Sequence, residues 1–109
     1  MNLGKLNNHT AERCFLGRSI FNLNDFVTWK AAITPDHFTD PRAKAIYTAQ
    51  LKIYEAGQQP DTTNIVTYFH AQGEDMTFDY LVDLMGTAGL EISYHAKTLL
   101  DCHARRAIL

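Results

Sequence analysis

The residues best suited to hold a metal ion are the histidines and the cysteine near the C-terminal end of the chain. His95, Cys102 and His103 fall on one predicted helix. Two helical ligands of one metal ion must lie about one turn apart, as in the pattern HExxH. Eight residues separate the two histidines, which places them about 12 Å apart along the helix. The spacing favours ordinary, partly buried histidines, and no metal site is predicted.

Two pairs of carboxylates lie close enough in sequence to act together as acid and base. Glu74 is followed by Asp75, and Asp79 precedes Asp83 by one turn of a short predicted helix. Like charges at this spacing repel only mildly in water and need no catalytic role. We therefore interpret both pairs as parts of a solvated face.

Covalent catalysis and nucleotide binding both lack a defining motif. Ser19, Ser93 and the two cysteines have no base and no orienting partner at positions set by a known motif. None of the glycines belongs to a GxxxxGK[ST] loop. Because Cys14 and Cys102 have no further cysteine framework, they indicate reduced thiols rather than a disulfide. The sequence predicts no catalytic residue and no cofactor within this chain.

Charge and hydropathy argue against two further classes of protein. The chain of 109 residues has a formal net charge of −2 at pH 7, and its basic residues form no block longer than Arg105-Arg106. Dedicated nucleic-acid binders need clustered cations, which this chain lacks. No apolar run reaches the length of a membrane span, and the N-terminal region lacks a signal-peptide pattern. We expect a cytosolic protein.

The elements that would position these residues are helices. With 46% hydrophobic residues, the chain can bury about two thirds of the surface of its unfolded form, which suits one compact domain. Asp40 can cap a helix that opens with Pro41 and ends at Gly57. Asp61 can cap the next helix, because Pro60 enforces a turn between the two. We predict an all-α bundle of about six helices.

The N-terminal third should contain two of these helices. Residues 1–9 have the composition of a flexible leader, and Thr10 can cap the first helix. The second helix should begin near Asn24 or Asp25 and end before Pro35, because a residue that precedes proline avoids the α region. The segment PDHF that starts at Pro35 should then make a single turn.

One polar residue interrupts the apolar face of the helix that opens with Pro41. Gln50 projects from the middle of the apolar sector of this helix, where a buried amide needs hydrogen-bond partners. We expect either that Gln50 extends its amide to solvent or that this edge of the helix faces another subunit.

The C-terminal half should contain three further helices. The helix after Asp61 should stop at Gly73, and Thr77 can cap a short fifth helix. The last helix should run from about Leu90 to the final residue. Its apolar stripe continues without a stop signal, so we expect the chain to be a fragment that packs against something further.

Five short segments occur in an order that resembles one protein family. They are AERCFLG, PDHF, IYTAQLKIYEAGQQPD, YLVDL and ISYHAKTLLDCHARRAIL, which begin at residues 11, 35, 46, 80 and 92. Together they resemble the N-terminal domain of DnaB-type replicative DNA helicases over about residues 10–109. No single segment is specific, but five in register across nearly the whole chain are fairly specific.

The chain also departs from the pattern of that family. Ala43 stands where the family usually has histidine, Asn64 where threonine is frequent, and His95 where tyrosine usually precedes alanine. The double glycine ahead of Tyr80 is missing, and the loop over residues 86–91 is shorter than usual. These departures indicate a divergent branch, for which a phage replisome is one source, and they affect partner specificity more than fold.

The resemblance implies that residues 10–109 form a non-catalytic domain of a hexameric ring helicase. ATP and Mg²⁺ would bind in a C-terminal domain outside this chain, which would unwind DNA in the 5′–3′ direction and make most DNA contacts. The N-terminal domains would pair as dimers within the hexamer and form a collar that docks the primase C-terminal domain and the helicase loader. The protein would be cytoplasmic, in a bacterial cell, with no membrane partner.

The same resemblance makes the last helix the first half of a helical hairpin that packs against another subunit. Without the second half, part of its apolar stripe would be exposed. Our interface hypothesis places four residues of this helix at or near subunit contacts: Ile92, Leu99, Leu100 and Ile108. Alternatively, some of them pack back onto the other helices.

Two other functions fit the composition. A free-standing helical adaptor of the replisome, such as a loader or a primase-associated domain, would differ only by the absence of a downstream ATPase. A helical DNA-binding domain would show affinity that falls steeply with salt, and we expect at most weak DNA binding.

Overall fold

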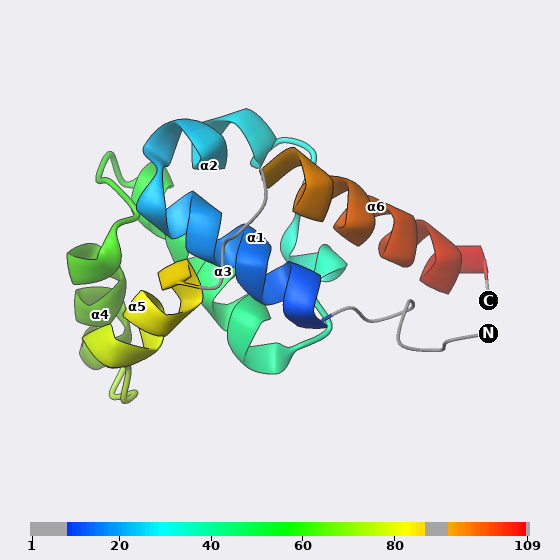
Figure 1. Ribbon diagram of the computed structural model, residues 1–109. Coiled ribbons are helices and arrows are strands. Elements are labelled where there is room, and N and C mark those ends of the chain that lie inside the picture. The colour runs from blue at the N-terminus through cyan, green and yellow to red at the C-terminus, as the bar shows by residue number, and fades with distance from the viewer. Residues whose placement is uncertain (1–8, 87–91, 109) are drawn as a thin grey trace.

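Six α-helices and one short 3₁₀ turn make up the described part of the chain (Figure 1). The computed structural model describes residues 9–86 and 92–108, and side chains within these ranges up to residue 105. The elements are α1 His9–Phe21, α2 Leu23–Trp29, η2 Pro35–His37, α3 Pro41–Glu55, α4 Thr62–Ala71, α5 Phe78–Gly86 and α6 Ile92–Ile108. The predicted all-α fold of about six helices is confirmed. No helix in the described ranges is long and apolar enough to cross a membrane.

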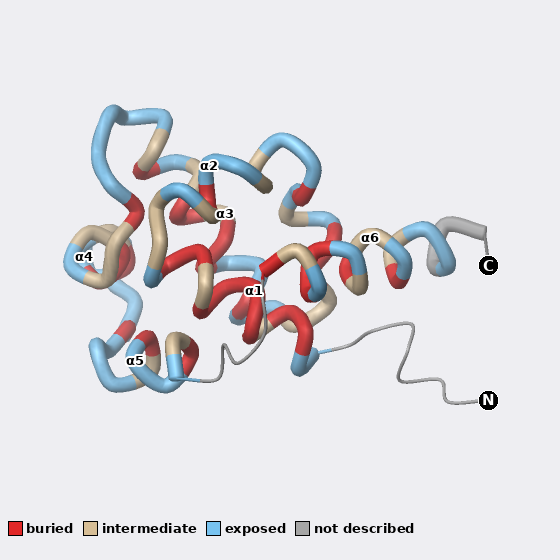
Figure 2. The backbone as a smooth tube through the Cα atoms, turned by 45° about the horizontal axis from the view of Figure 1, so that its top comes forward, coloured by how far each residue is buried: buried red, intermediate tan, exposed pale blue. Residues whose placement is uncertain are grey.

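Helix α1 runs through the centre of the molecule. It packs against α2, α3, α5 and α6, and buried residues gather along it in Figure 2. Phe15 and Leu16 are completely buried. A helix with neighbours on several faces needs apolar residues on more than one side, and α1 has them.

The core around α1 is rich in aromatic rings centred on Tyr47 of α3. The ring centroids of Phe38 and Phe15 lie 5.0 and 5.8 Å from that of Tyr47, and the ring of Phe26 lies 6.1 Å away. The Tyr47 hydroxyl donates a 2.7 Å hydrogen bond to the carbonyl oxygen of Ile33. Burial raises the pKa of Tyr47, and the bond supplies the partner that a buried phenol needs.

Three of the predicted helix caps are confirmed. The side chain of Asp40 accepts a 3.0 Å hydrogen bond from the backbone N–H of Arg42, with Pro41 at the first helical position of α3. Asp61 accepts from the N–H of Asn64 at 2.9 Å. The hydroxyl of Thr77 accepts from the N–H of Tyr80 at 3.2 Å. Each cap satisfies a backbone donor that the first turn of a helix leaves unpaired.

The first two helices begin one or two residues earlier than predicted. Helix α1 already includes His9, so Thr10 is its second residue rather than its cap. Helix α2 is capped by Asn22, whose side-chain oxygen accepts from the N–H groups of Asn24 and Asp25 at 2.9 and 3.3 Å. It follows α1 with a single residue between them, which the apolar pattern does not reveal.

The predicted ends of α3 and α4 agree with the structure, whereas α2 ends earlier than predicted. That helix ends at Trp29, and a turn leads to the buried Ile33 before η2 begins at Pro35. Gly57 and Gly73 follow α3 and α4 with φ of 85° and 76°, a backbone conformation that suits glycine. Of the expected leader over residues 1–9, only His9 is described, and it belongs to α1. The expected start of the last helix at Leu90 lies outside the described residues.

Gln50 follows neither of the two expectations stated for it. It is completely buried within the chain. Its amide nitrogen and the hydroxyl oxygen of Ser19 lie 3.3 Å apart, and the same hydroxyl lies 3.4 Å from the amide oxygen and donates to the Leu16 carbonyl at 2.8 Å. The correction is therefore that α1 supplies the partner of this amide, as burial of a polar group requires.

Helices α1 and α5 cross at Gly17. A Cβ atom added there would lie 2.0 Å from the carbonyl oxygen of Leu84 and 3.1 Å from the Cα atom of Met85. The absence of a side chain at Gly17 thus allows the two backbones to touch.

Candidate interaction surfaces

Helix α6 is the element on which the sequence hypothesis places subunit contacts. It packs against α1 and η2. Figure 1 shows its C-terminal turns extending past the body formed by the other helices. Towards the body it buries Ala96 and Cys102. One face of α6 therefore belongs to the core of this chain, and its far end extends away from the other described helices.

The structure divides the four hypothesised interface residues into groups. Ile92 and Leu99 are 6% and 1% exposed and belong to the core of the chain itself. Leu100 is partly buried and packs against the edge of this core. The side chain of Ile108 lies outside the described ones. The structure thus brings Ile92 and Leu99 together in the core, and among the described members only Leu100 keeps surface for a partner.

The outer face of α6 carries an aromatic residue that the sequence analysis did not select. Tyr94 is 61% exposed. Asp101 on the same face pairs with Arg105 across 3.1 Å. The signal was available, because Tyr94 and Asp101 are seven residues apart and lie opposite the apolar stripe of α6. A partner that binds the outer face of α6 would therefore contact Tyr94.

A histidine of α6 contacts a histidine of η2. Among the described residues, no group of three or more His, Cys, Asp or Glu side chains could hold a metal ion. The rings of His103 and of His37 in η2 are in contact, with centroids 4.3 Å apart and an angle of 42° between their planes. A backbone N–H of Thr34 donates to Nδ1 of His37 at 3.0 Å, so η2 holds this ring in place. The prediction that these residues are ordinary, partly buried histidines agrees with their positions.

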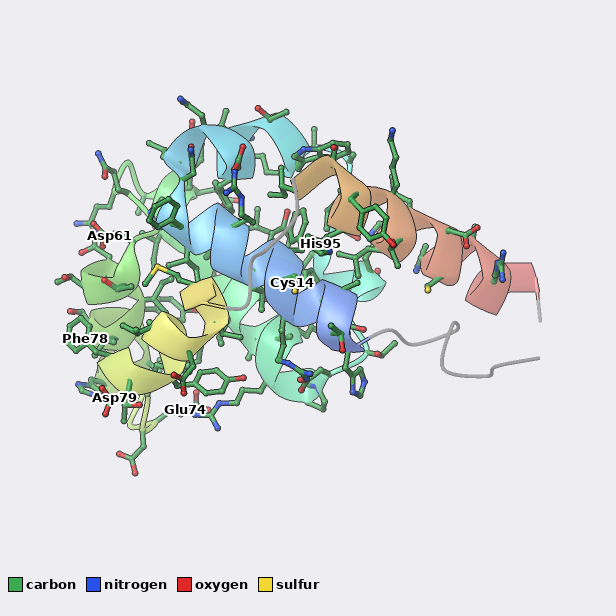
Figure 3. All side chains as sticks on the ribbon, in the orientation of Figure 1. Cys14, Asp61, Glu74, Phe78, Asp79 and His95 are labelled. Carbon is green, nitrogen blue, oxygen red and sulfur yellow. The ribbon has the colours of Figure 1, made fainter. Side chains whose placement is uncertain are left out.

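His95 is buried close to the N-terminal end of α6 (Figure 3). Among the residues that the structure describes, neither of its ring nitrogens has a hydrogen-bond partner. Burial lowers the pKa of His95, and the positive charge of Arg18 lowers it further. The Arg18 guanidinium is itself paired with Asp25 at 3.0 Å. His95 is therefore a neutral core residue near neutral pH.

The exposed face of α5 combines apolar and acidic residues. Phe78 and Val82 are 48% and 54% exposed and lie one turn apart. Asp79 and Asp83 are exposed on an adjoining row of the same helix. The expected solvated acidic face is thus incomplete, because the same surface also exposes Phe78 and Val82.

The comparisons with known proteins agree on one family. Residues 4–101 match the family described as DnaB-like helicase N terminal domain. The fold is similar to the crystal structure of the N-terminal domain of DnaB helicase from Mycobacterium tuberculosis, with a TM-score of 0.84 and 20% sequence identity. The alignment covers 92% of this chain and 75% of that one. No curated protein sequence matches the chain.

Proposed function

Because the chain belongs to the family of DnaB-like helicase N-terminal domains, we propose that it is the non-catalytic collar domain of a hexameric replicative DNA helicase. In this proposal the domain begins with α1 at His9 and continues to residue 109, and the residues ahead of His9 form its leader. The observation that carries the proposal is the family match over residues 4–101. The similarity of the whole fold supports it.

In this proposal the collar assembles through pairs of N-terminal domains and docks the primase C-terminal domain and the helicase loader. The far end of α6 supports a role in assembly, since it extends beyond the body of this chain (Figure 1). Leu100 and Ile108 would contact the neighbouring subunit, and Ile92 and Leu99 would hold α6 on its own body.

The parent protein in this proposal is an ATP-dependent 5′–3′ DNA helicase of a bacterial cytoplasm, encoded by the bacterium or by a phage. The described residues contain no group of three or more His, Cys, Asp or Glu side chains that could hold a metal ion. None of the glycines of the chain belongs to a GxxxxGK[ST] loop. In the proposal, ATP and Mg²⁺ bind to a C-terminal domain outside this chain, which also makes most of the DNA contacts.

Native mass spectrometry of the full product of the gene tests the proposal. We expect a hexamer that hydrolyses ATP. We also expect the purified primase of the same replisome to bind this hexamer. A free-standing helical adaptor is the alternative, and a full product that ends shortly after residue 109 and lacks ATPase activity would replace the proposal with it.

Self-association of the chain alone gives a second test. Light scattering coupled to size exclusion should show dimers that form with increasing concentration. A DNA-binding domain would instead bind a fluorescent duplex with an affinity that falls steeply with salt, and such binding by the chain alone would contradict a collar role.

A further inference from the structure

We propose that the exposed face of α5 is a docking site for a basic, amphipathic helix of a partner protein. The docking face consists of Phe78, Val82, Asp79 and Asp83, with Glu74 and Asp75 in the segment that leads into α5. The proposed function includes the docking of partner proteins, and this inference names the surface that binds one of them and the chemistry of that partner. It rests on the proposed function only for the assumption that the partner belongs to the replisome.

The first observation is the distribution of apolar residues around α5. Leu81 and Leu84 are buried against the body, so the core needs only one side of the helix. Phe78 and Val82 lie outside this buried sector and remain about half exposed. Neighbouring apolar residues on one exposed helical face are a feature of surfaces that bind a partner helix.

The second observation is the charge beside this apolar pair. Asp79 and Asp83 follow Phe78 and Val82 by one residue each, so the two rows run side by side along α5. Residues 74–86 contain no lysine or arginine. None of the ion pairs found among the described residues includes Glu74, Asp75, Asp79 or Asp83. The docking face therefore carries uncompensated negative charge at neutral pH.

Two basic residues, Arg42 and Arg13, lie near Tyr80, beyond the acidic row. The Arg42 guanidinium stacks on the ring of Tyr80, with 3.9 Å between its carbon and the ring centroid. Tyr80 is partly buried and lies on the side of α5 away from Phe78 and Val82. Arg42 thus marks the edge of the docking face and leaves its centre acidic.

The face is also open in space. An added Cβ atom at Gly86, the last residue of α5, would meet no other atom within 4 Å. Figure 3 shows Phe78 and Asp79 at the outer side of the molecule, with no other helix in front of them. A helix laid along α5 would therefore not need to displace any described element.

Charge decides between a second copy of the chain and a different partner. A two-fold pairing through α5 would place this acidic face against itself, and such like-charge contacts oppose association. A partner helix with an apolar stripe flanked by lysine and arginine would cover Phe78 and Val82 and would neutralise Asp79 and Asp83. The docking face thus fits a basic amphipathic helix.

Three synthetic peptides of about 18 residues serve as probes, a length that gives about five helical turns. The first has leucines at three- and four-residue spacing flanked by lysines. The second replaces the lysines by glutamate, and the third keeps the composition of the first in scrambled order. ¹H–¹⁵N spectra of the chain map the contact, and the fluorescence anisotropy of the labelled peptides gives the dissociation constants.

We expect only the first peptide to bind, with amide shifts concentrated in residues 74–86. Phe78→Ser and Val82→Ser should each raise its dissociation constant about tenfold, as loss of a central apolar contact does. The double variant Asp79→Asn, Asp83→Asn should weaken binding about as much and reduce its dependence on salt between about 50 and 500 mM NaCl. Because all four side chains are exposed, the variants should keep the fold, which circular dichroism checks.

Matched controls come from exposed residues of other helices. Val27→Ser on α2 and Glu55→Gln on α3 remove an exposed apolar residue and an exposed carboxylate, and each should change the constant less than about twofold. Equal effects of the controls, equal binding of the acidic peptide, or shifts outside residues 74–86 would overturn the inference. Shifts of the same amides with protein concentration alone would assign the face to a second copy of the chain.

The two proposals fail separately. If the first peptide does not bind but the full product is a hexamer, the docking site is wrong and the collar role stands. If the peptide binds as expected but the full product is a monomer without ATPase activity, the docking site stands on an adaptor protein.

Discussion

The carboxylate of Glu12 on α1 accepts a 2.6 Å hydrogen bond from the hydroxyl group of Thr39, 27 residues further along the chain. It also accepts from the backbone N–H groups of Thr39 and Asp40 at 3.0 and 2.9 Å. Glu12 is completely buried. One carboxylate of the central helix therefore fixes the turn from which α3 starts.

Replacing Glu12 with alanine should destabilise the fold strongly. The Glu12→Ala variant leaves two N–H groups and one hydroxyl without their acceptor, and we expect a loss of about 3 kcal/mol in the free energy of unfolding. Urea denaturation followed by circular dichroism measures it. Glu55→Ala removes an exposed carboxylate and should stay within about 0.5 kcal/mol of the original chain. Similar losses for the two variants would show that the hydrogen bonds of Glu12 do not contribute to the stability of the fold.

A methyl group at the crossing of α1 and α5 should not be tolerated. In the Gly17→Ala variant the new Cβ atom would meet the backbone carbonyl oxygen of Leu84 at 2.0 Å, and no side-chain rotation can move either atom away. We expect a loss of about 3 kcal/mol or more in the free energy of unfolding. Gly86→Ala is the matched control, since its Cβ atom meets nothing within 4 Å. A thermal midpoint of Gly17→Ala equal to that of the control would contradict this close crossing.

The buried His95 should make the fold sensitive to acid. Because burial and Arg18 lower the pKa of His95 in the folded chain, the unfolded chain binds the proton more readily. The contribution to stability is fully present above the unfolded-state pKa of about 6.5 and is lost as the pH falls below it. Urea denaturation between about pH 5 and pH 8 measures this slope for the original chain and for His95→Leu.

The His95→Leu variant should lose part of the dependence of stability on pH, because leucine fills the site without a titrating group. His9→Leu replaces an exposed histidine and should leave the dependence unchanged. If the curves for the original chain and for His95→Leu run parallel over the whole range, His95 is not the group that responds to acid.

Helix formation was predictable wherever the determining residues are close in sequence. Asp40 with Pro41 and Asp61 after Pro60 act within one turn of the helix that they begin, and the structure contains both caps. The start of α2 was predicted only approximately, because Asn22, Asn24 and Asp25 are all suitable caps and the apolar pattern does not choose among them. The choice is visible only in the hydrogen bonds of Asn22.

The contacts between helices were not predictable from local pattern. Gln50 was noticed as an anomaly, but its partner Ser19 is 31 residues away and no periodicity connects the two. The role of Gly17 was likewise invisible, since a glycine inside a helix does not reveal which backbone lies against it. On α5 the acidic row was predictable from its spacing. The apolar row beside it was not, because the sequence does not show which apolar residues of the helix the core leaves exposed.

The subunit-contact hypothesis can be tested at Leu100. This residue packs at the edge of the core, so the Leu100→Asp variant should keep the isolated chain folded while it weakens self-association of the full helicase. We expect the dissociation constant of the assembly to rise at least about tenfold, as for loss of an apolar interface contact. Native mass spectrometry measures the assembly, and circular dichroism with urea measures the fold.

The neighbouring residue supplies the comparison for Leu100. Leu99 is 1% exposed within the chain itself, so Leu99→Asp places an unpaired charge in the core and should unfold the isolated chain. Lys97→Asp on the exposed face of α6 tests whether any new negative charge on this helix has the same effect, and it should change neither fold nor assembly. If Leu100→Asp unfolds the chain as Leu99→Asp does, then Leu100 serves the core of its own subunit. The contacts between subunits must then be sought at the far end of α6.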